Sequence, residues 1–283
     1  MQKLSDPFAG AARGSAGVAT PSPAGTLESP SLFVAGETRA DAPAAYELKF
    51  LLPEETARAV ADRVSSRLAA DPYADPALGG AYRTTSLYTD TPRFDVLRRT
   101  SDYASSKYRV RQYGAAGPVF LERKDKDGNR VRKCRATVPA DDLAVLARRH
   151  APADWVGGWF RDQVAERELV PVCRISYERV AFMGVADGGA VRVTFDRNIR
   201  GEAADGWEVR AVGDVPELLP GLVVCEFKFR VALPAMLKEV VEALALTPAT
   251  VSKYRRFARA AGFAGADAVE SAIPVVGGSA ANG

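Results

Sequence analysis

YELKFLLPEE, at residues 46–55, places charged side chains between apolar ones, with Glu47 and Lys49 two residues apart. Successive side chains of a β-strand point to opposite faces, so this segment predicts a strand with one apolar face and one face that carries an acid and a base. A second segment, CEFKFR at residues 225–230, repeats this order of residue types, with its acid at Glu226. We therefore expect two similar strands in one sheet, although they lie far apart in the chain.

Six further segments of β-type composition lie between these two, separated by residues that are typical of turns. They are RTTSLYTD (83–90), KYRVRQY (107–113), VFLERKDK (119–126), NRVRKCRATV (129–138), CRISYERVAF (173–182) and AVRVTFD (190–196). The KDGN sequence that joins two of them is typical of a hairpin turn. The short connections predict a mostly antiparallel sheet of about eight strands.

Four segments predict helices. Residues 53–70 begin with proline and two acids and then carry apolar residues at helical spacing. Residues 139–149 and 233–246 begin with similar signals, and Ser252 is the expected N-cap of a helix over 252–260. We predict an α+β fold: an antiparallel β-barrel, or a strongly curved sheet, with covering helices.

Basic side chains gather on one face of the predicted strands, as in the alternation of Lys107, Arg109 and Arg111. One such strand is most often the solvated face of an ordinary sheet. Five or six strands that favour Arg and Lys indicate instead that the charged face lines a barrel. Buried like charges cost several kcal/mol per ion unless they are paired, so this interior is predicted to be wet and to bind phosphate polyanions. The scattered Glu residues would then hold Mg²⁺ or Mn²⁺, which prefer oxygen ligands.

Residue composition and charge indicate which class of protein the chain belongs to. The chain has 283 residues, 47% of them hydrophobic, and a formal net charge of +3. Residues 107–135 contain ten Lys or Arg against three acids, a local excess larger than the charge of the whole chain. Three widely spaced cysteines argue against a disulfide framework, and the sequence lacks a signal peptide and an apolar run of membrane-spanning length. We expect a cytoplasmic protein.

Three regions are predicted along the chain. Residues 1–43 are rich in Ala, Gly, Pro and Ser without periodicity, so they are expected to form a disordered tail. Residues 44–263 contain every predicted strand and helix and form the expected folded domain. Residues 264–283 have a composition similar to that of the first region and are expected to form a flexible C-terminal tail.

The segments stand in an order that resembles a known family. YELKF, SLYTDTP, KYRVRQY, LERKDKDG, ISYERVAF, VRVTFD, CEFKF and SKY follow one another as in the VTC domain, the polyphosphate polymerase module of the vacuolar transporter chaperone complex. That family is a branch of the triphosphate tunnel metalloenzymes, also called CYTH-like proteins. The resemblance extends from about Tyr46 to Phe257. It implies a barrel with a basic interior that transfers the γ-phosphoryl group of ATP to inorganic polyphosphate.

The resemblance also implies roles for individual residues. Catalytic contacts to the transferring phosphates are implied for Arg109, Arg111, Arg179, Arg192 and Lys228. Phosphate binding is implied for Lys49, Lys124, Lys133 and Lys253, although Arg132 and Arg135 compete with Lys133 for its place. A divalent metal, Mn²⁺ or Mg²⁺, is implied at Glu226. Glu47 is either a second metal ligand or the partner of a tunnel lysine.

The sequence departs from related phosphohydrolases at one position and leaves other functions open. Those enzymes carry a further acid two residues before the position of Glu47, where this chain has Ala45. This difference counts against a simple triphosphatase. The alternatives are a triphosphate or tripolyphosphate hydrolase and a module that binds polyphosphate or nucleotide without turnover. The expected partners are ATP, polyphosphate and pyrophosphate. Nucleic acid is not expected, since no aromatic residues interleave a basic surface, and the sequence identifies no membrane partner.

Overall fold

The computed structural model describes residues 45–100, 103–128, 130–148 and 150–263. The predicted tails lie outside these ranges, so their expected state stays a prediction. In the described part the strands are β1 (Ala45–Pro53), β2 (Ala69–Ala70), β3 (Tyr82–Asp90), β4 (Ser106–Tyr113), β5 (Val119–Asp127), β6 (Arg130–Val138), β7 (Val170–Ala186), β8 (Gly189–Ala203) and β9 (Leu222–Phe229). All eight predicted strands are present, and only the two-residue β2 was not expected.

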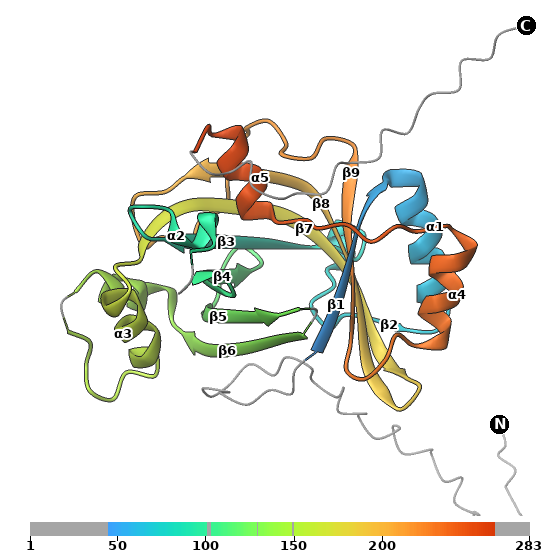
Figure 1. Cartoon of the computed structure of the whole chain (residues 1–283), viewed down its shortest axis with the longest axis horizontal. Helices are drawn as coiled ribbons and strands as arrows, with labels where there is room; N and C mark the ends of the chain where they lie inside the picture. The colour runs from blue at the N-terminus through green and yellow to red at the C-terminus, as the bar shows by residue number, and fades with distance from the viewer. Residues whose placement is uncertain (1–44, 101–102, 129, 149, 264–283) are drawn as a thin grey trace, which may run out of the picture. The chain divides into compact units, whose positions relative to one another are not determined.

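Hydrogen bonding closes the sheet on itself. The strand order is β7-β3-β4-β5-β6-β1-β9-β8, and β8 then pairs with β7, so eight antiparallel strands form a barrel, with β2 attached to β7. The predicted antiparallel β-barrel is confirmed, and the first and last strands are neighbours (Figure 1). β1 and β9 pair at eight positions from Tyr46 to Pro53, but β1 and β6 pair at only two. The barrel is therefore least tightly closed between β1 and β6.

Two helices cover the outer face of β1, β8 and β9. They are α1 (Glu54–Ser65) and α4 (Ala235–Ala243), which lie side by side (Figure 1). Their apolar residues join the outward-pointing apolar residues of the strands in one buried cluster that includes Val60, Val64, Leu237, Phe50, Phe195 and Phe227. Burying each such side chain stabilises the fold by about 1.5–3 kcal/mol. Because the apolar face is covered in this way, the charged face of the same strands must point inward.

A second apolar cluster covers β4, β5 and β6. It contains the 3₁₀ helix η3 (Ala140–Ala147) and helix α3 (Gly158–Glu166). Residues 139–149 were predicted to be α-helical, and the part over 140–147 is instead a 3₁₀ helix. Leu143 and Leu146 are both buried, which suits three residues per turn. Helix α3 was not predicted, because its glycine-rich start lacks a side-chain cap.

The third cluster fills one end of the barrel. Helix α5 (Lys253–Ala260) begins at the N-cap Ser252, as predicted, and packs with the short helix α2 (Asp95–Arg98) against β3 and β7, while a 3₁₀ turn, η1 (Pro76–Leu78), precedes β3. The buried carboxylate of Asp90 accepts hydrogen bonds from the Val96 and Leu97 backbone and from the Tyr254 hydroxyl. These bonds fix the start of α5 beside the barrel interior. No helix in the described ranges has the length and apolarity to cross a membrane.

Candidate active site

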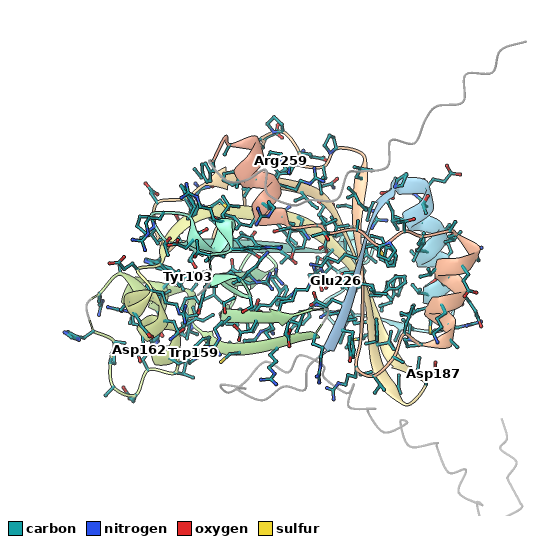
Figure 2. All side chains as sticks on the ribbon, viewed as in Figure 1. Tyr103, Trp159, Asp162, Asp187, Glu226 and Arg259 are labelled. Atoms are coloured by element: carbon teal, nitrogen blue, oxygen red, sulfur yellow. The ribbon has the colours of Figure 1, made fainter. Side chains whose placement is uncertain are left out.

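The two acid and base pairs of the opening segments meet inside the barrel. The β1–β9 register places Lys49 opposite Glu226 and Glu47 opposite Lys228. Lys49 Nζ lies 3.3 Å from Glu226 Oε2, and Lys228 Nζ lies 2.9 Å from Glu226 Oε1 and 3.5 Å from Glu47 Oε1. Figure 2 shows Glu226 beside β1, among the side chains that fill the space inside the sheet. Lys49 Nζ also lies 3.9 Å from Glu47 Oε2, so the two carboxylates share the same two ammonium groups.

Glu47 also reaches across the weakly closed side of the barrel. Lys124 of β5 places its Nζ 2.6 Å from Glu47 Oε2. Burial alone would raise the pKa of Glu47, as would Glu226, but the surrounding lysines outweigh both and lower it to about 2. Burial lowers the pKa of Lys124 to about 8, and the neighbouring Glu47 only partly offsets this effect. Glu47 therefore pairs with a tunnel lysine, which is one of its two predicted roles.

A buried glutamate organises the middle of the barrel. The side chain of Glu122 is fully buried, and its carboxylate lies 2.7 Å from Arg109, 2.5 Å from Lys133 and 2.5 Å from Arg135. Burial opposes ionisation, but the three cations together hold the pKa of Glu122 well below its usual range. Lys133 and Arg135 both point inward, whereas Arg132 is exposed on the outer face of β6. Of the two competitors for the place of Lys133, only Arg135 shares the interior.

A second buried acid joins β7, β8 and α5. Asp196 accepts hydrogen bonds from Arg179 at 2.6 and 2.8 Å and from Lys253 at 2.6 Å. Lys253 Nζ also lies 4.5 Å from the centre of the Tyr177 ring, which favours a cation–π contact. Burial raises the pKa of Asp196, but Arg179 and Lys253 outweigh it and leave the pKa lowered. Lys253 therefore reaches the barrel interior from α5.

Arg192 pairs with a buried acid and a tyrosine hydroxyl. Its Nη2 donates to Asp71 at 2.5 Å and to the Tyr82 hydroxyl at 2.8 Å. Burial, partly offset by the nearby arginines, raises the pKa of Tyr82 to about 12, so this hydroxyl stays protonated. Tyr82 belongs to an aromatic group with Tyr73 and Tyr113, whose ring centres lie 5.5–6.0 Å apart.

Eight of the eleven predicted site residues line one cavity of about 90 Å³ inside the barrel. They are Lys49, Arg109, Arg111, Lys124, Arg179, Glu226, Lys228 and Lys253. Glu47 and Lys133 border it through their ion pairs with Lys124 and Glu122, and Arg192 lies with Asp71 instead. The structure brings the cations together as expected; their catalytic roles stay predictions.

The buried acids Glu122, Asp196 and Asp71 were not predicted as site residues. A signal for Glu122 was present: the KDGN sequence predicts a hairpin, and the β5–β6 pairing places Glu122 opposite Arg135. Asp196 ends the predicted segment 190–196, but its partners come from β7 and α5, which local sequence does not identify. Asp71 lies after β2, outside every predicted motif, so nothing in the sequence pointed to it.

The donor set fits a hard divalent ion that takes most of its ligands from substrate. No group of three or more His, Cys, Asp or Glu suited to a metal occurs in the part of the chain that the structure describes. Glu47 and Glu226 face the same lysines and would supply two carboxylates. Mg²⁺ is commonly held by one or two carboxylates together with phosphate oxygens and water. These two residues therefore suit a Mg²⁺ or Mn²⁺ ion that takes its other ligands from phosphate oxygens and water.

The ionisation of Glu47 predicts how the stability of the folded state depends on pH. The pKa of Glu47 falls from 4.5 to about 2 on folding, so its ionised form stabilises the folded state above pH 4.5 and loses this effect as the pH falls through 2. A shift of this size corresponds to about 3 kcal/mol. We expect the free energy of unfolding, measured with urea, to fall over this range. The free energy of unfolding of Glu47→Gln should fall less over this pH range. An equal fall in Glu47→Gln and the wild type would show that Glu47 does not cause it.

The family model of the VTC domain matches residues 44–260. The chain belongs to the VTC domain family. The match covers the whole barrel and all eleven predicted site residues of this VTC domain. No curated protein matches the sequence.

Solved structures include relatives of low identity. The VTC domain is similar to a proposed adenylate cyclase from Bacillus halodurans, with 14% identity and a TM-score of 0.46 over 76% of this chain and 97% of that chain. It is also similar to a proposed adenylyl cyclase from Hippeastrum that is described as having a dominant triphosphatase activity. That match has 14% identity and a TM-score of 0.46 over 77% of this chain and 96% of the other.

Proposed function

We propose that this VTC domain is a metal-dependent phosphotransferase that moves the γ-phosphoryl group of ATP to the end of an inorganic polyphosphate chain. One observation carries the proposal: in the part of the chain that the structure describes, eight Lys or Arg and two acids line the cavity inside the barrel. Such an excess of buried positive charge is costly unless an anion fills the site. Membership of the VTC domain family supports a phosphate polymer as that anion.

The arrangement suits phosphoryl transfer because this reaction depends on positioning and charge neutralisation more than on covalent help from the protein. Arg109 and Arg111 lie two residues apart on the inner face of β4, where their planar guanidinium groups can bind phosphate oxygens in pairs. Arg179 faces them from β7 and is held by Asp196. In the proposal these arginines stabilise charge on the transferring group, and Arg192 contacts phosphate from its place beside Asp71.

The lysines and glutamates complete the proposed site. Lys49, Lys124, Lys133 and Lys253 bind phosphates of the donor and of the chain, and Lys228 acts beside Glu226. Glu226 and Glu47 hold Mg²⁺ or Mn²⁺, which when bound would neutralise charge on the phosphates. The attacking oxygen belongs to a phosphate that is already ionised at neutral pH, so no protein base is needed. This agrees with the absence of any histidine from the residues that line the cavity.

A phosphorus NMR time course with ATP, Mn²⁺ and a trace of pyrophosphate tests the proposal. We expect signals of internal polyphosphate phosphates to grow as ADP accumulates. Free phosphate without polymer would identify a hydrolase and overturn the proposal. ATP that stays intact while tripolyphosphate still binds would identify a binding module and overturn it as well.

A further inference from the structure

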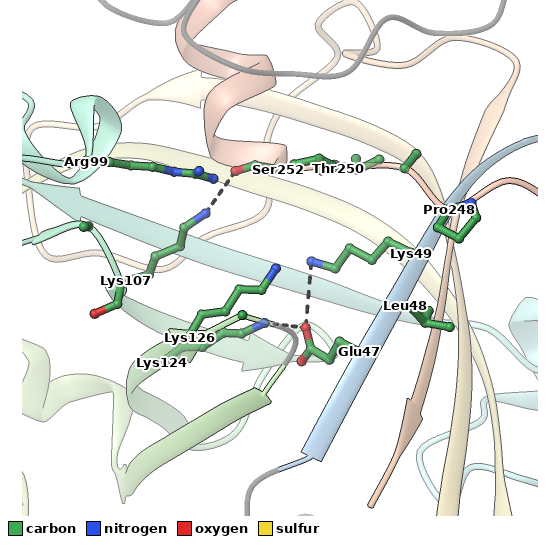
Figure 3. Close-up of a pocket in the computed structure, with 15 residues that line it drawn as sticks. Glu47, Leu48, Lys49, Arg99, Lys107, Lys124, Lys126, Pro248, Thr250 and Ser252 are labelled. Atoms are coloured by element: carbon green, nitrogen blue, oxygen red, sulfur yellow. Dashed lines mark hydrogen bonds and ion pairs between the residues drawn. The ribbon is translucent and has the colours of Figure 1, made fainter. Parts of the chain in front are cut away.

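A second and larger cavity opens on the weakly closed side of the barrel. Its volume is about 420 Å³, and it is lined by β1, the start of β4, the end of β5 and residues 248–252 before α5. Figure 3 shows Arg99 and Lys107 on one side of this cavity and Lys49 on the other. The volume lies within the usual range for ligand pockets, about 300–1,000 Å³. We call this cavity the vestibule.

The vestibule is strongly and unevenly charged. Among the residues that the structure describes, its lining includes one acid, Glu47, and five cations, Lys49, Arg99, Lys107, Lys124 and Lys126. Glu47 is already paired with three lysines of the tunnel. The lining therefore carries four more positive charges than negative ones. Because Glu47 pairs with the tunnel lysines, it does not balance the charges of the outer cations Arg99, Lys107 and Lys126.

The three outer cations, Arg99, Lys107 and Lys126, form no salt bridge with an acid among the described residues. Lys107 Nζ contacts the Ser252 hydroxyl at 3.2 Å, a neutral partner (Figure 3). Burial, followed by repulsion from Lys49 and Lys124, lowers the pKa of Lys107 well below its ordinary value. Arg99 and Lys126 form no salt bridge or side-chain hydrogen bond with any residue that the structure describes. An anion in the vestibule would relieve this repulsion.

The lining indicates the kind of anion. Its described residues include no Phe, Tyr, Trp or His, so they offer no ring on which a nucleobase could stack. Aromatic residues gather instead around Tyr73, Tyr82 and Tyr113, near Arg192. The vestibule also shares Lys49, Lys107, Lys124, Val251 and Ser252 with the tunnel cavity, so the two spaces adjoin. A chain of phosphates fits this passage better than a nucleoside does.

We propose that the vestibule binds the inorganic polyphosphate chain where the chain passes into or out of the tunnel. Arg99, Lys107 and Lys126 hold successive phosphates outside the reacting centre, and the nucleoside of ATP lies away from them. The inference rests on the proposed function for the identity of the chain, but binding to the vestibule requires no turnover. Holding the chain outside the tunnel would keep a growing polymer attached between successive transfers and so lengthen the product.

Binding measurements with a charge-matched control test this proposal. Arg99→Gln/Lys126→Gln removes two exposed cations of the vestibule, whereas Arg98→Gln/Lys238→Gln removes two exposed cations that do not line it. Calorimetry would compare long-chain polyphosphate, pyrophosphate and a non-hydrolysable ATP analogue. We expect the first variant to weaken long-chain binding about tenfold relative to the control. Binding of pyrophosphate should change less than twofold.

Two results would overturn the proposal. Equal long-chain affinity in the two variants would show that the vestibule does not hold the polymer. An equal loss of affinity for the ATP analogue would show that the vestibule binds the nucleotide. A protein that makes no polymer in the NMR experiment but shows the expected difference in long-chain binding would refute the proposed function and leave the vestibule as a polyphosphate site.

Discussion

Glu226→Gln is expected to slow phosphoryl transfer about a thousandfold while the barrel stays folded. Glutamine keeps the size of the side chain but is a poor ligand for Mg²⁺ or Mn²⁺. A metal ion contributes several kcal/mol of charge stabilisation in reactions of this kind, and about 4 kcal/mol corresponds to three factors of ten in rate. Steady-state kinetics would measure the loss, and circular dichroism would check the fold.

The same variant should separate metal binding from phosphate binding. Glu226 now pairs with Lys49 and Lys228 at 3.3 and 2.9 Å, so its loss frees both lysines for phosphate. Calorimetry without metal should therefore show tripolyphosphate binding that is unchanged or tighter. Binding of Mn²⁺ to the tripolyphosphate complex, followed by electron paramagnetic resonance, should weaken. A Glu226→Gln protein that binds Mn²⁺ normally and still makes polymer would contradict the metal role.

Glu47→Gln is the matched comparison for Glu226→Gln, because both glutamates contact the same lysines. The proposed site uses both carboxylates for the ion, so Glu47→Gln should also slow transfer; a much smaller loss than in Glu226→Gln would show that Glu47 chiefly pairs with Lys124. An equal loss in the two variants would show that both carboxylates hold the ion.

Much of the fold follows from the alternation of side chains. The apolar faces of the strands identify the side that helices must cover, and the charged faces identify the interior. Closure also follows, since the first and last strands of a barrel become neighbours. This is how Lys49 comes to lie opposite Glu226 across the β1–β9 pair. The sequence could not specify the eight paired positions of β1 and β9 or the short β1–β6 pairing, because register between distant strands depends on packing.

The unpredicted parts of the site are the pairings between distant elements. Asp196 could have been an end-of-strand surface acid; only the approach of α5 brings Lys253 to it. Asp71 meets Arg192 because β2 attaches to β7, and a two-residue strand has no sequence signal. The contacts of Glu122 with Lys133 and Arg135 differ, because all three residues lie on the two strands of one hairpin. Its register could have been derived from the KDGN turn, which places Lys124 opposite Lys133 and Glu122 opposite Arg135.

Glu122→Gln is expected to lower the free energy of unfolding by about 3–5 kcal/mol. Its carboxylate is the shared partner of Arg109, Lys133 and Arg135, and removing one member of a buried charged group leaves uncompensated charge. Urea unfolding would measure the change. Glu54→Gln is the control, because Glu54 pairs with Arg58 and Arg197 at the more exposed α1 and should cost at most about 1 kcal/mol.

Tripolyphosphate should restore the lost stability of Glu122→Gln. A ligand that binds only the folded state stabilises it by about 2.7 kcal/mol at one hundred times its dissociation constant. The variant presents three cations without their carboxylate, so it should gain more than the wild type at the same concentration. A larger gain in the wild type would show that Glu122 assists anion binding instead of competing with it.

The pH dependence of the variant provides an independent check on this reasoning. Burial and Arg135 already hold the pKa of Lys133 well below its ordinary value, even with Glu122 present. Without Glu122 that pKa should fall further, so the folded state binds fewer protons than the unfolded state up to about pH 10.5. The stability of Glu122→Gln should therefore rise with pH over a wider range, which begins at a lower pH than in the wild type. Parallel pH profiles for the two proteins would show that water in the barrel, and not Glu122, balances the charge of Lys133.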